Sequence, residues 1–187
     1  IDRIIISTDC EEIAEVAKAA NAEIPYMRPA HLAEDSSPEW QVWRHALAHF
    51  KEMEGSYPDL LMVVPPTAPL RAPEDLDACL DEYEKGRCDI VITVTDSGSS
   101  PYFSQVEIDP EGLAGLAISP KTPITRRQDA PTVYDITPVG YVVDPEFVMA
   151  KNGIFEGVVR TVFVPRERAV DIDTDWDFRI AEFFLSD

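Results

Sequence analysis

Two apolar runs on either side of a helical pattern constrain the fold more than any other feature of this sequence. The first run, DLLMVV at residues 59–64, predicts a buried strand because it is short, apolar and followed at once by turn residues. Those turn residues are Pro65, Pro66 and Pro69. Helical spacing over residues 74–85 follows, and DIVITVT at residues 89–95 predicts a second buried strand. The order strand, helix, strand predicts a parallel sheet with right-handed crossovers, and therefore an α/β fold.

The first fifty residues repeat this rhythm. Residues 3–7 form a continuous β-branched run, which predicts a strand buried on both faces. Thr8 and Asp9 are good caps for a helix whose inner face we expect to carry Ile13, Val16, Ala17 and Ala20. Residues 22–29 predict a short strand. A second helix is expected to open at Ser36 or Ser37, with helical spacing of Trp40, Trp43, Leu47 and Phe50.

From residue 97 to about residue 165 the pattern changes to short strands separated by glycine and proline turns. This texture predicts a mixed or antiparallel extension of the sheet. A last helix is expected from Thr174, which can cap it together with Asp177. Its apolar stripe would consist of Ile180, Phe183 and Phe184. With no internal repeat and no linker, residues 1–187 predict a single domain.

Composition speaks against several classes of partner. A net charge of −19 argues against nucleic acid and anionic membrane, since both need clustered lysine and arginine. The longest apolar runs are too short to span a bilayer. The three cysteines have neither a disulfide pattern nor a CxxC spacing, which favours buried thiols and a cytoplasmic protein. They are Cys10, Cys79 and Cys88. An anionic ligand would therefore need a site that concentrates the scarce positive charge.

Aspartates occupy every second position near the end of the chain, in RAVDIDTDWDF at residues 168–178. In an extended segment Asp171 and Asp173 would project to the same face, roughly 7 Å apart. Two such carboxylates can share one hard divalent cation, for which Mg²⁺ is the natural candidate. The alternative is that Asp173 or Thr174 only caps the last helix and that the other acids are solvated.

Two further segments carry candidate ligand-binding residues. PPTAPLR at residues 65–71 follows the first buried strand, where open α/β sheets bind their ligands, and Thr67 and Arg71 suit a phosphate or carboxylate. Residues 121–135 hold the basic cluster of Lys121, Arg126 and Arg127. Neighbouring arginines point in different directions in an extended segment, so we expect at most one to face a ligand. Either segment can also be an ordinary solvated loop.

Five motifs, taken in order, resemble the acylneuraminate cytidylyltransferase (CMP-sialic acid synthetase) family. They are IISTD, RPAHLAED, PPTAPLR, RRQDAPTVY and VDIDTDWDF, and the match runs from Arg3 to about Leu185. The resemblance implies a three-layer α/β sandwich with a mostly parallel, Rossmann-like sheet of the nucleotide-diphospho-sugar transferase type and a small mixed β extension. It also implies a homodimer that transfers CMP from CTP to a nonulosonic acid and releases pyrophosphate, in nucleotide-sugar biosynthesis.

The resemblance also implies roles for individual residues. Asp171 and Asp173 match the metal-binding aspartates of the family, which would hold Mg²⁺ and act in catalysis. The nucleotide-binding side is matched by Arg28, Thr67 and Arg71. The acceptor-sugar pocket is matched by Arg127, Gln128 and Tyr141, with Arg127 also counted as catalytic because it would hold the sugar carboxylate. Phe155 matches an aromatic arm that reaches into the partner subunit, and residues 101–165 match a dimerisation and sugar-binding extension.

The sequence departs from the family pattern at four places. Pro65 replaces a glutamine, and Glu39 replaces a serine near the nucleotide. DITPVGY at residues 135–141 replaces an RPNGAIY-like segment. The first strand and the Gly-rich triphosphate loop of the family are expected upstream of Ile1, so we expect the chain to be N-terminally incomplete and inactive alone. Two alternatives stay open: a cytidylyltransferase for a 3-deoxy-octulosonate-like acid, and a non-catalytic nucleotide-sugar-binding module.

Overall fold

The computed structural model describes residues 1–186. Contacts within the chain separate it into two compact units. The first unit comprises Ile1–Val63 and Val143–Val158, and the second comprises Val64–Val142 and the chain from Val159 onward. The expectation of one domain stays a prediction, and each unit is described by itself. No helix among residues 1–186 is long and apolar enough to cross a membrane.

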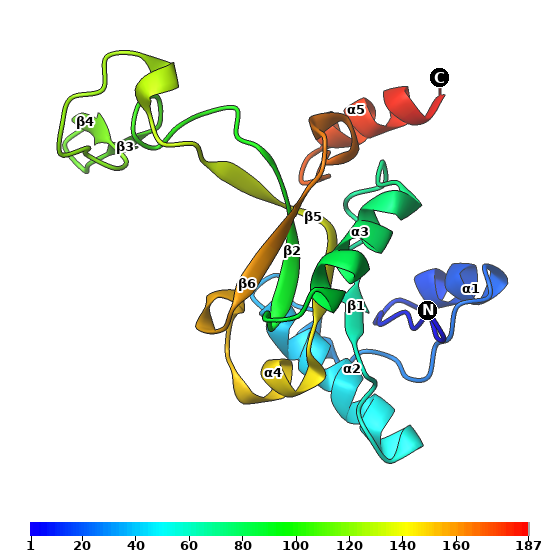
Figure 1. The fold of residues 1–187 in the computed structure, drawn as a ribbon. Coiled ribbons are helices and arrows are strands. Elements are labelled where there is room, and N and C mark those ends of the chain that lie inside the picture. Colours follow the sequence, from blue (N-terminus) through cyan, green and yellow to red (C-terminus); the bar gives the residue numbers. More distant parts are fainter. Residues whose placement is uncertain (187) are drawn as a thin grey trace. The chain divides into compact units, whose positions relative to one another are not determined.

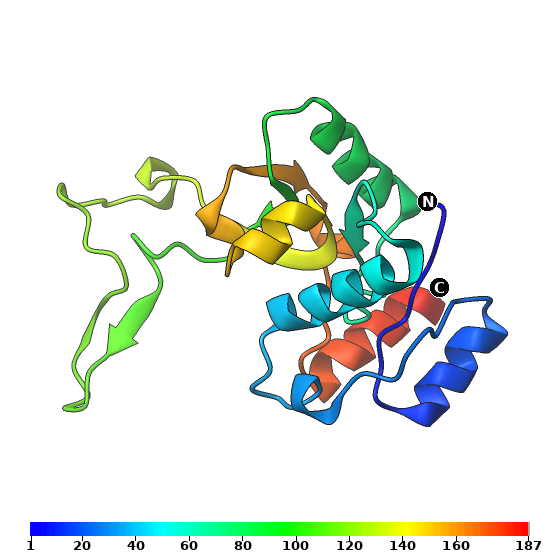
Figure 2. The ribbon, with the colours of Figure 1, turned by 90° about the horizontal axis from the view of Figure 1, so that it is seen from below.

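The first unit is built around the packing of two helices, α2 (Glu39–Glu54) and α4 (Pro145–Ala150). Both figures of the fold show them side by side (Figures 1 and 2). Trp40 packs edge-on against Phe147, with 5.7 Å between ring centroids, and its indole N–H donates to the carbonyl of Lys151 at 2.7 Å. Gly55 ends α2 in the left-handed conformation at φ 83°, where a glycine avoids strain. The predicted helix and its buried tryptophans are thus confirmed.

The start of the chain differs from its prediction. Residues 3–7 form no strand; Ile5 makes one isolated parallel bridge with Glu23, and Ile4 is 60% exposed. A β-branched run forms a buried strand only when neighbours pair with it on both edges, and in the described chain this segment pairs with one residue. The first helix, α1 (Glu11–Ala19), is confirmed, but it buries Ala14 and exposes Ile13 and Val16. The unit also holds β1 (Leu61–Val63), which is half-buried.

The second unit contains the central strands. β2 (Ile90–Asp96) is buried along nearly its whole length and lies between β5 (Tyr134–Val143) and β6 (Val159–Phe163). β2 and β6 pair in parallel, with Ile90 opposite Val159 and Val94 opposite Phe163. Helix α3 (Pro73–Glu84) packs against this pair, in agreement with the predicted strand, helix, strand order. β5 and β6, which were expected in the extension, therefore belong to the same sheet as β2.

The remaining elements of the second unit are a hairpin and the last helix. β3 (Val106–Ile108) and β4 (Ala114–Leu116) form a separate antiparallel pair, which lies apart from the β2–β6 strands in both views (Figures 1 and 2). Helix α5 (Asp175–Ser186) begins with the predicted cap, since Thr174 N–H donates to the Asp177 carboxylate at 2.9 Å. Its expected apolar stripe is wrong: Ala181 is buried, whereas Phe183 and Phe184 are exposed.

Candidate active site

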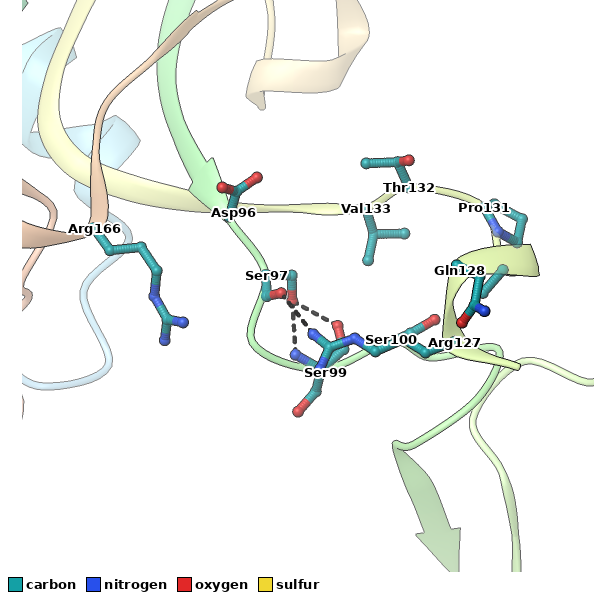
Figure 3. Close-up of a pocket in the computed structure, with 11 residues that line it drawn as sticks. Asp96, Ser97, Ser99, Ser100, Arg127, Gln128, Pro131, Thr132, Val133 and Arg166 are labelled. Atoms are coloured by element: carbon teal, nitrogen blue, oxygen red, sulfur yellow. Dashed lines mark hydrogen bonds between the residues drawn. The ribbon is translucent and has the colours of Figure 1, made fainter. Parts of the chain in front are cut away.

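An open cavity of about 570 Å³ lies at the carboxyl ends of the parallel strands β2 and β6. Residues from three segments line it (Figure 3): the end of β2 and the loop after it, the segment 127–133, and Arg166 after β6. The first segment contributes Asp96, Ser97, Ser99 and Ser100. This is the edge at which α/β sheets place their ligands, because loops from neighbouring parallel strands meet there. The cavity is therefore a candidate ligand-binding site of the second unit.

The loop after β2 is rich in serine and folds on its own hydrogen bonds. Ser97 Oγ donates to the carbonyl of Ser99 at 2.8 Å, and the N–H of Ser100 donates to Ser104 Oγ at 2.9 Å. Arg127 reaches this loop and donates to the carbonyl of Gly98 at 2.9 Å. The loop is thus held by hydrogen bonds between side chains and the backbone. Arg127 donates to the loop through Nη2, which leaves its other guanidinium N–H groups available to an anion.

The predicted sugar-pocket residues are only partly brought together. Arg127 and Gln128 both line the cavity. Arg126 does not line it but forms a two-bond fork with Asp129 at 2.8 and 2.9 Å, in line with the expectation that only one of two adjacent arginines faces a ligand. Tyr141 is buried in β5 and is not among the lining residues, and Phe155 belongs to the first unit, where it is 73% exposed.

Arg166 is a cavity residue that the sequence analysis missed. It lies three residues after the end of β6, and the signal that could have found it is this position after a strand parallel to β2. The sequence pattern instead predicted that residues 160–165 belong to an extension, so it gave no reason to expect Arg166 at a ligand site.

The acidic segment and the proline-rich turn meet at one backbone hydrogen bond. The N–H of Ile172, between Asp171 and Asp173, donates to the carbonyl of Thr67 at 2.8 Å. Sequence reasoning had proposed both segments for the nucleotide and its metal, and the structure brings them together. Residues 170–173 belong to no strand, however, and the expected same-face placement of Asp171 and Asp173 stays a prediction.

The two aspartates have different surroundings. Oδ1 of Asp171 is buried and accepts no hydrogen bond from any described residue, whereas Asp173 is exposed. A buried carboxylate oxygen without a donor is costly unless a cation or water satisfies it, so this donor set fits a hard divalent cation. Residues 1–186 contain no cluster of three or more potential metal-ligating side chains. Such a cation would therefore complete its shell with ligand oxygens and water.

Arg71 fastens the proline-rich turn from within. Its guanidinium donates to the carbonyl of Pro65 and, at 3.4 Å, to that of Pro138, and burial lowers its pKa. Its Nε is buried and has no partner among the described residues. Arg71 thus uses part of its fork to hold the turn of Thr67, and the expected contact with nucleotide phosphate stays a prediction.

A buried ion pair supports the acidic segment and was not foreseen. Arg168 forms a fork on Asp75, with its Nε and Nη2 at 2.9 and 2.8 Å from the carboxylate, and Asp75 is only 4% exposed. Asp75 also accepts the N–H of Ala72 at 2.9 Å, which caps α3. Since Arg168 stands three residues before Asp171, this pair ties the acidic segment to the start of α3.

The remaining nucleotide-side residues lie in the first unit. Arg28 donates to the hydroxyl of Ser7 at 3.2 Å and to its carbonyl. Glu39 accepts the indole N–H of Trp43 at 3.2 Å, and burial raises the pKa of this carboxyl. Both side chains are therefore anchored within their own unit, and the assignment of Arg28 to the nucleotide stays a prediction.

Comparisons with known proteins identify relatives over nearly the whole chain. No protein-family model matches. Post-translational flagellin modification protein B of Campylobacter coli is 30% identical over 185 residues, covering 98% of this chain and 77% of the relative. CMP-N,N'-diacetyllegionaminic acid synthase of Campylobacter jejuni is 31% identical over 183 residues, again covering 98% and 77%.

Solved structures agree on the fold. A 4-diphosphocytidyl-2C-methyl-D-erythritol synthase from Anaerococcus prevotii matches with a TM-score of 0.65 at 15% identity, covering 100% of this chain and 80% of that one. A CMP:2-keto-3-deoxy-manno-octonic acid synthetase complexed with CTP matches with a TM-score of 0.64 at 11% identity, covering 100% and 81%. These matches confirm the expected nucleotide-diphospho-sugar transferase fold, here with a mixed sheet. With relatives at 30% and 31% identity, the chain belongs to the acylneuraminate cytidylyltransferase family of nucleotidyltransferases.

Proposed function

We propose that the protein transfers CMP from CTP to a nonulosonic acid of the legionaminic or sialic type, giving the CMP-sugar and pyrophosphate. The observation that carries this proposal is the 31% identity to a CMP-N,N'-diacetyllegionaminic acid synthase across nearly the whole chain. The cavity beside Arg127 and Gln128 supports it, because an acidic acceptor needs a cation in a chain of net charge −19.

In the proposed reaction a hydroxyl of the sugar attacks the α-phosphorus of CTP and pyrophosphate leaves. Arg127 would hold the sugar carboxylate with the guanidinium N–H groups that do not donate to Gly98. This contact would orient the attacking hydroxyl of the sugar. Asp171 and Asp173 are the residues that would hold Mg²⁺, which supplies positive charge for the triphosphate oxygens. The bond from Ile172 to Thr67 keeps these carboxylates beside the turn proposed for the nucleotide.

Exchanging either aspartate for asparagine tests the metal assignment. In the full-length protein, Asp171→Asn and Asp173→Asn are each expected to lower kcat for pyrophosphate release by at least about 100-fold, the scale of losing one preorganised electrostatic contact. Asp175→Asn is the matched control, since this substitution removes the same charge from an exposed aspartate at the start of α5. Near-normal turnover of both variants at saturating Mg²⁺ would remove the metal assignment.

The choice of acceptor is tested by pyrophosphate release across a panel of acids. We expect turnover with N,N'-diacetyllegionaminic acid to exceed turnover with 3-deoxy-octulosonate, and the reverse order would support the octulosonate alternative. We also propose a homodimer working in the cytoplasm. The 73% exposure of the Phe155 side chain supports the homodimer, because an exposed aromatic side chain can fill a pocket of a second chain.

A further inference from the structure

Arg166 has a charge that the described protein leaves uncompensated. Its side chain is exposed at the cavity, and no hydrogen bond or ion pair joins its guanidinium to any residue among 1–186. In a chain with 35 acidic and 16 basic residues, an arginine without an acidic partner is available to a ligand. Arg168, two residues later, shows the contrast, since its fork is occupied by Asp75.

Arg166 and Arg127 both approach Gly98 in the serine-rich loop. Arg127 donates to the carbonyl of Gly98 at 2.9 Å, and a Cβ placed on Gly98 would lie 3.4 Å from Nη2 of Arg166. Figure 3 shows the loop passing between the two arginines. Asp96 is the acidic residue of the lining, and it pairs with neither of them. Two guanidinium groups that line one cavity without a bridging carboxylate repel each other, and a bound anion would offset this repulsion.

An anion bound in this cavity would belong to the acceptor rather than to the triphosphate. The residues proposed for the nucleotide and its metal in this unit, Thr67, Arg71 and Asp171, do not line the cavity. The cavity instead offers serine hydroxyls, the amide of Gln128 and two guanidinium groups. This set suits a polyhydroxylated molecule that carries a carboxylate.

We propose that Arg166 is a second recognition residue for the carboxylate of the acceptor acid, opposite Arg127. This inference rests on the proposed function and deepens it, because it gives the acceptor site two cations, one from each side of the loop after β2. Two guanidinium groups select an acid over a neutral sugar more strongly than one, since a neutral acceptor leaves both charges unpaired.

The test is a kinetic comparison of Arg166→Gln with the wild-type protein. We expect the KM for N,N'-diacetyllegionaminic acid to rise about tenfold, the scale of one lost charge-assisted hydrogen bond. The KM for CTP should stay within about twofold. Arg166→Lys should recover part of the loss, because it keeps the charge but not the fork. Arg179→Gln removes an equal charge from α5 outside the cavity and should leave both KM values unchanged.

An acceptor whose carboxylate is converted to a carboxamide provides the second arm. If Arg166 binds the carboxylate, Arg166→Gln should change the KM for this analogue by less than about twofold. An unchanged KM for the acid, an equal loss with the carboxamide, or a rise confined to CTP would each overturn the inference while leaving the proposed function intact. A wild-type protein that releases no pyrophosphate with any acid of the panel would overturn the proposed function and this inference with it.

Discussion

At the scale of single residues, Asp75 shows how the fold uses a buried charge. Burial by itself would raise the pKa of this carboxyl, but the hydrogen bonds from Arg168 and from the N–H of Ala72, together with the charge of Arg168, outweigh burial and lower the pKa. The sequence could not predict this pair, because its partners are 93 residues apart and Asp75 reads as an ordinary acid in the first turn of a helix.

Removing Arg168 should destabilise the protein by leaving Asp75 buried and unpaired. We expect Arg168→Met to lower the free energy of unfolding by about 2 kcal/mol, less than for a fully enclosed pair because Arg168 is 40% exposed. Urea titration followed by circular dichroism measures this loss. Arg126→Met is the matched control, since it breaks the exposed fork on Asp129 and should cost at most about 0.5 kcal/mol. Equal losses in the two variants would contradict the role of burial.

The lowered pKa of Asp75 also sets a pH dependence. A group whose pKa is lower in the folded than in the unfolded chain contributes stability above its unfolded pKa, and this contribution is lost as the pH falls through the folded pKa. We therefore expect the contribution of the pair to be complete above about pH 4, the unfolded value for aspartate, and to disappear below it. Unfolding free energies of wild type and Asp75→Asn, measured from pH 6 to pH 3, should converge at the acid end. A gap that widens on acidification would contradict this assignment.

At the scale of elements, β2 joins β5 through a hydroxyl as well as through its backbone. Thr93 is fully buried, and its Oγ1 lies 2.8 Å from the carbonyl of Thr137 and 3.1 Å from that of Gly140. The N–H of Gly140 also donates to this oxygen at 3.2 Å. By contrast, Oγ1 of Thr95 is buried and has no partner among the described residues. The same strand thus contains one threonine whose hydroxyl is hydrogen-bonded and one whose hydroxyl has no partner among the described residues.

This pair gives a comparison at constant side-chain shape. Thr93→Val should lower the free energy of unfolding by about 2 kcal/mol, because the buried polar groups of β5 lose their partner. Thr95→Val should be neutral or stabilising by about 0.5 kcal/mol, because it removes a hydroxyl whose burial is not compensated. Thermal unfolding of the two variants side by side measures the difference. A larger loss at Thr95 would contradict the hydrogen-bond pattern.

The elements that could be predicted are those whose own residues decide their structure. The β-branched run of β2 and the spaced tryptophans of α2 specify strand and helix locally, and both are confirmed. The prediction for residues 3–7 was wrong because a strand also needs partner strands, and the pattern within the run carries no information about them. The faces of α1 and α5 failed for a related reason: helical spacing shows which residues share a face, but the packing partner decides which face is buried, and here it selects Ala14 and Ala181.

The candidate site shows the same division. Arg127 and Gln128 were identified through the family resemblance, which rests on five motifs taken together, and the structure places both at the cavity. Arg166 and the pair of Arg168 with Asp75 were missed because their importance arises from contacts between distant segments. The alternation of aspartates with apolar residues could not predict that Asp173 is exposed or that residues 170–173 belong to no strand.

At the scale of the whole molecule, the net charge opposes the proposed homodimer. Each chain carries −19, so two chains repel each other before any contact forms, and apolar anchors such as Phe155 must outweigh this repulsion. Salt shortens the range of the repulsion from about 30 Å at 0.01 M to about 10 Å at 0.1 M. The dimer should therefore be stronger at the higher salt concentration.

Analytical ultracentrifugation can test both parts of this expectation. Phe155→Ala should weaken dimerisation about tenfold, the scale of losing one interface anchor, and the wild-type dimer should tighten between 0.01 M and 0.1 M NaCl. Phe183→Ala is a matched control, since this phenylalanine is 63% exposed and lies on α5. A mass of one chain at every concentration would exclude the dimer, and an equal effect of both substitutions would exclude Phe155 as its anchor.

The hydrogen bond between Ile172 and Thr67 joins two main-chain groups, and this has a consequence for how the protein can change over generations. Nearly every amino acid has a backbone N–H and a backbone carbonyl. Substitutions at either position can therefore change the side-chain contacts nearby without removing this hydrogen bond. The acidic segment can therefore stay hydrogen-bonded to the proline-rich turn while the side chains of both segments change. Proline at position 172 is the exception, because it has no backbone N–H to donate.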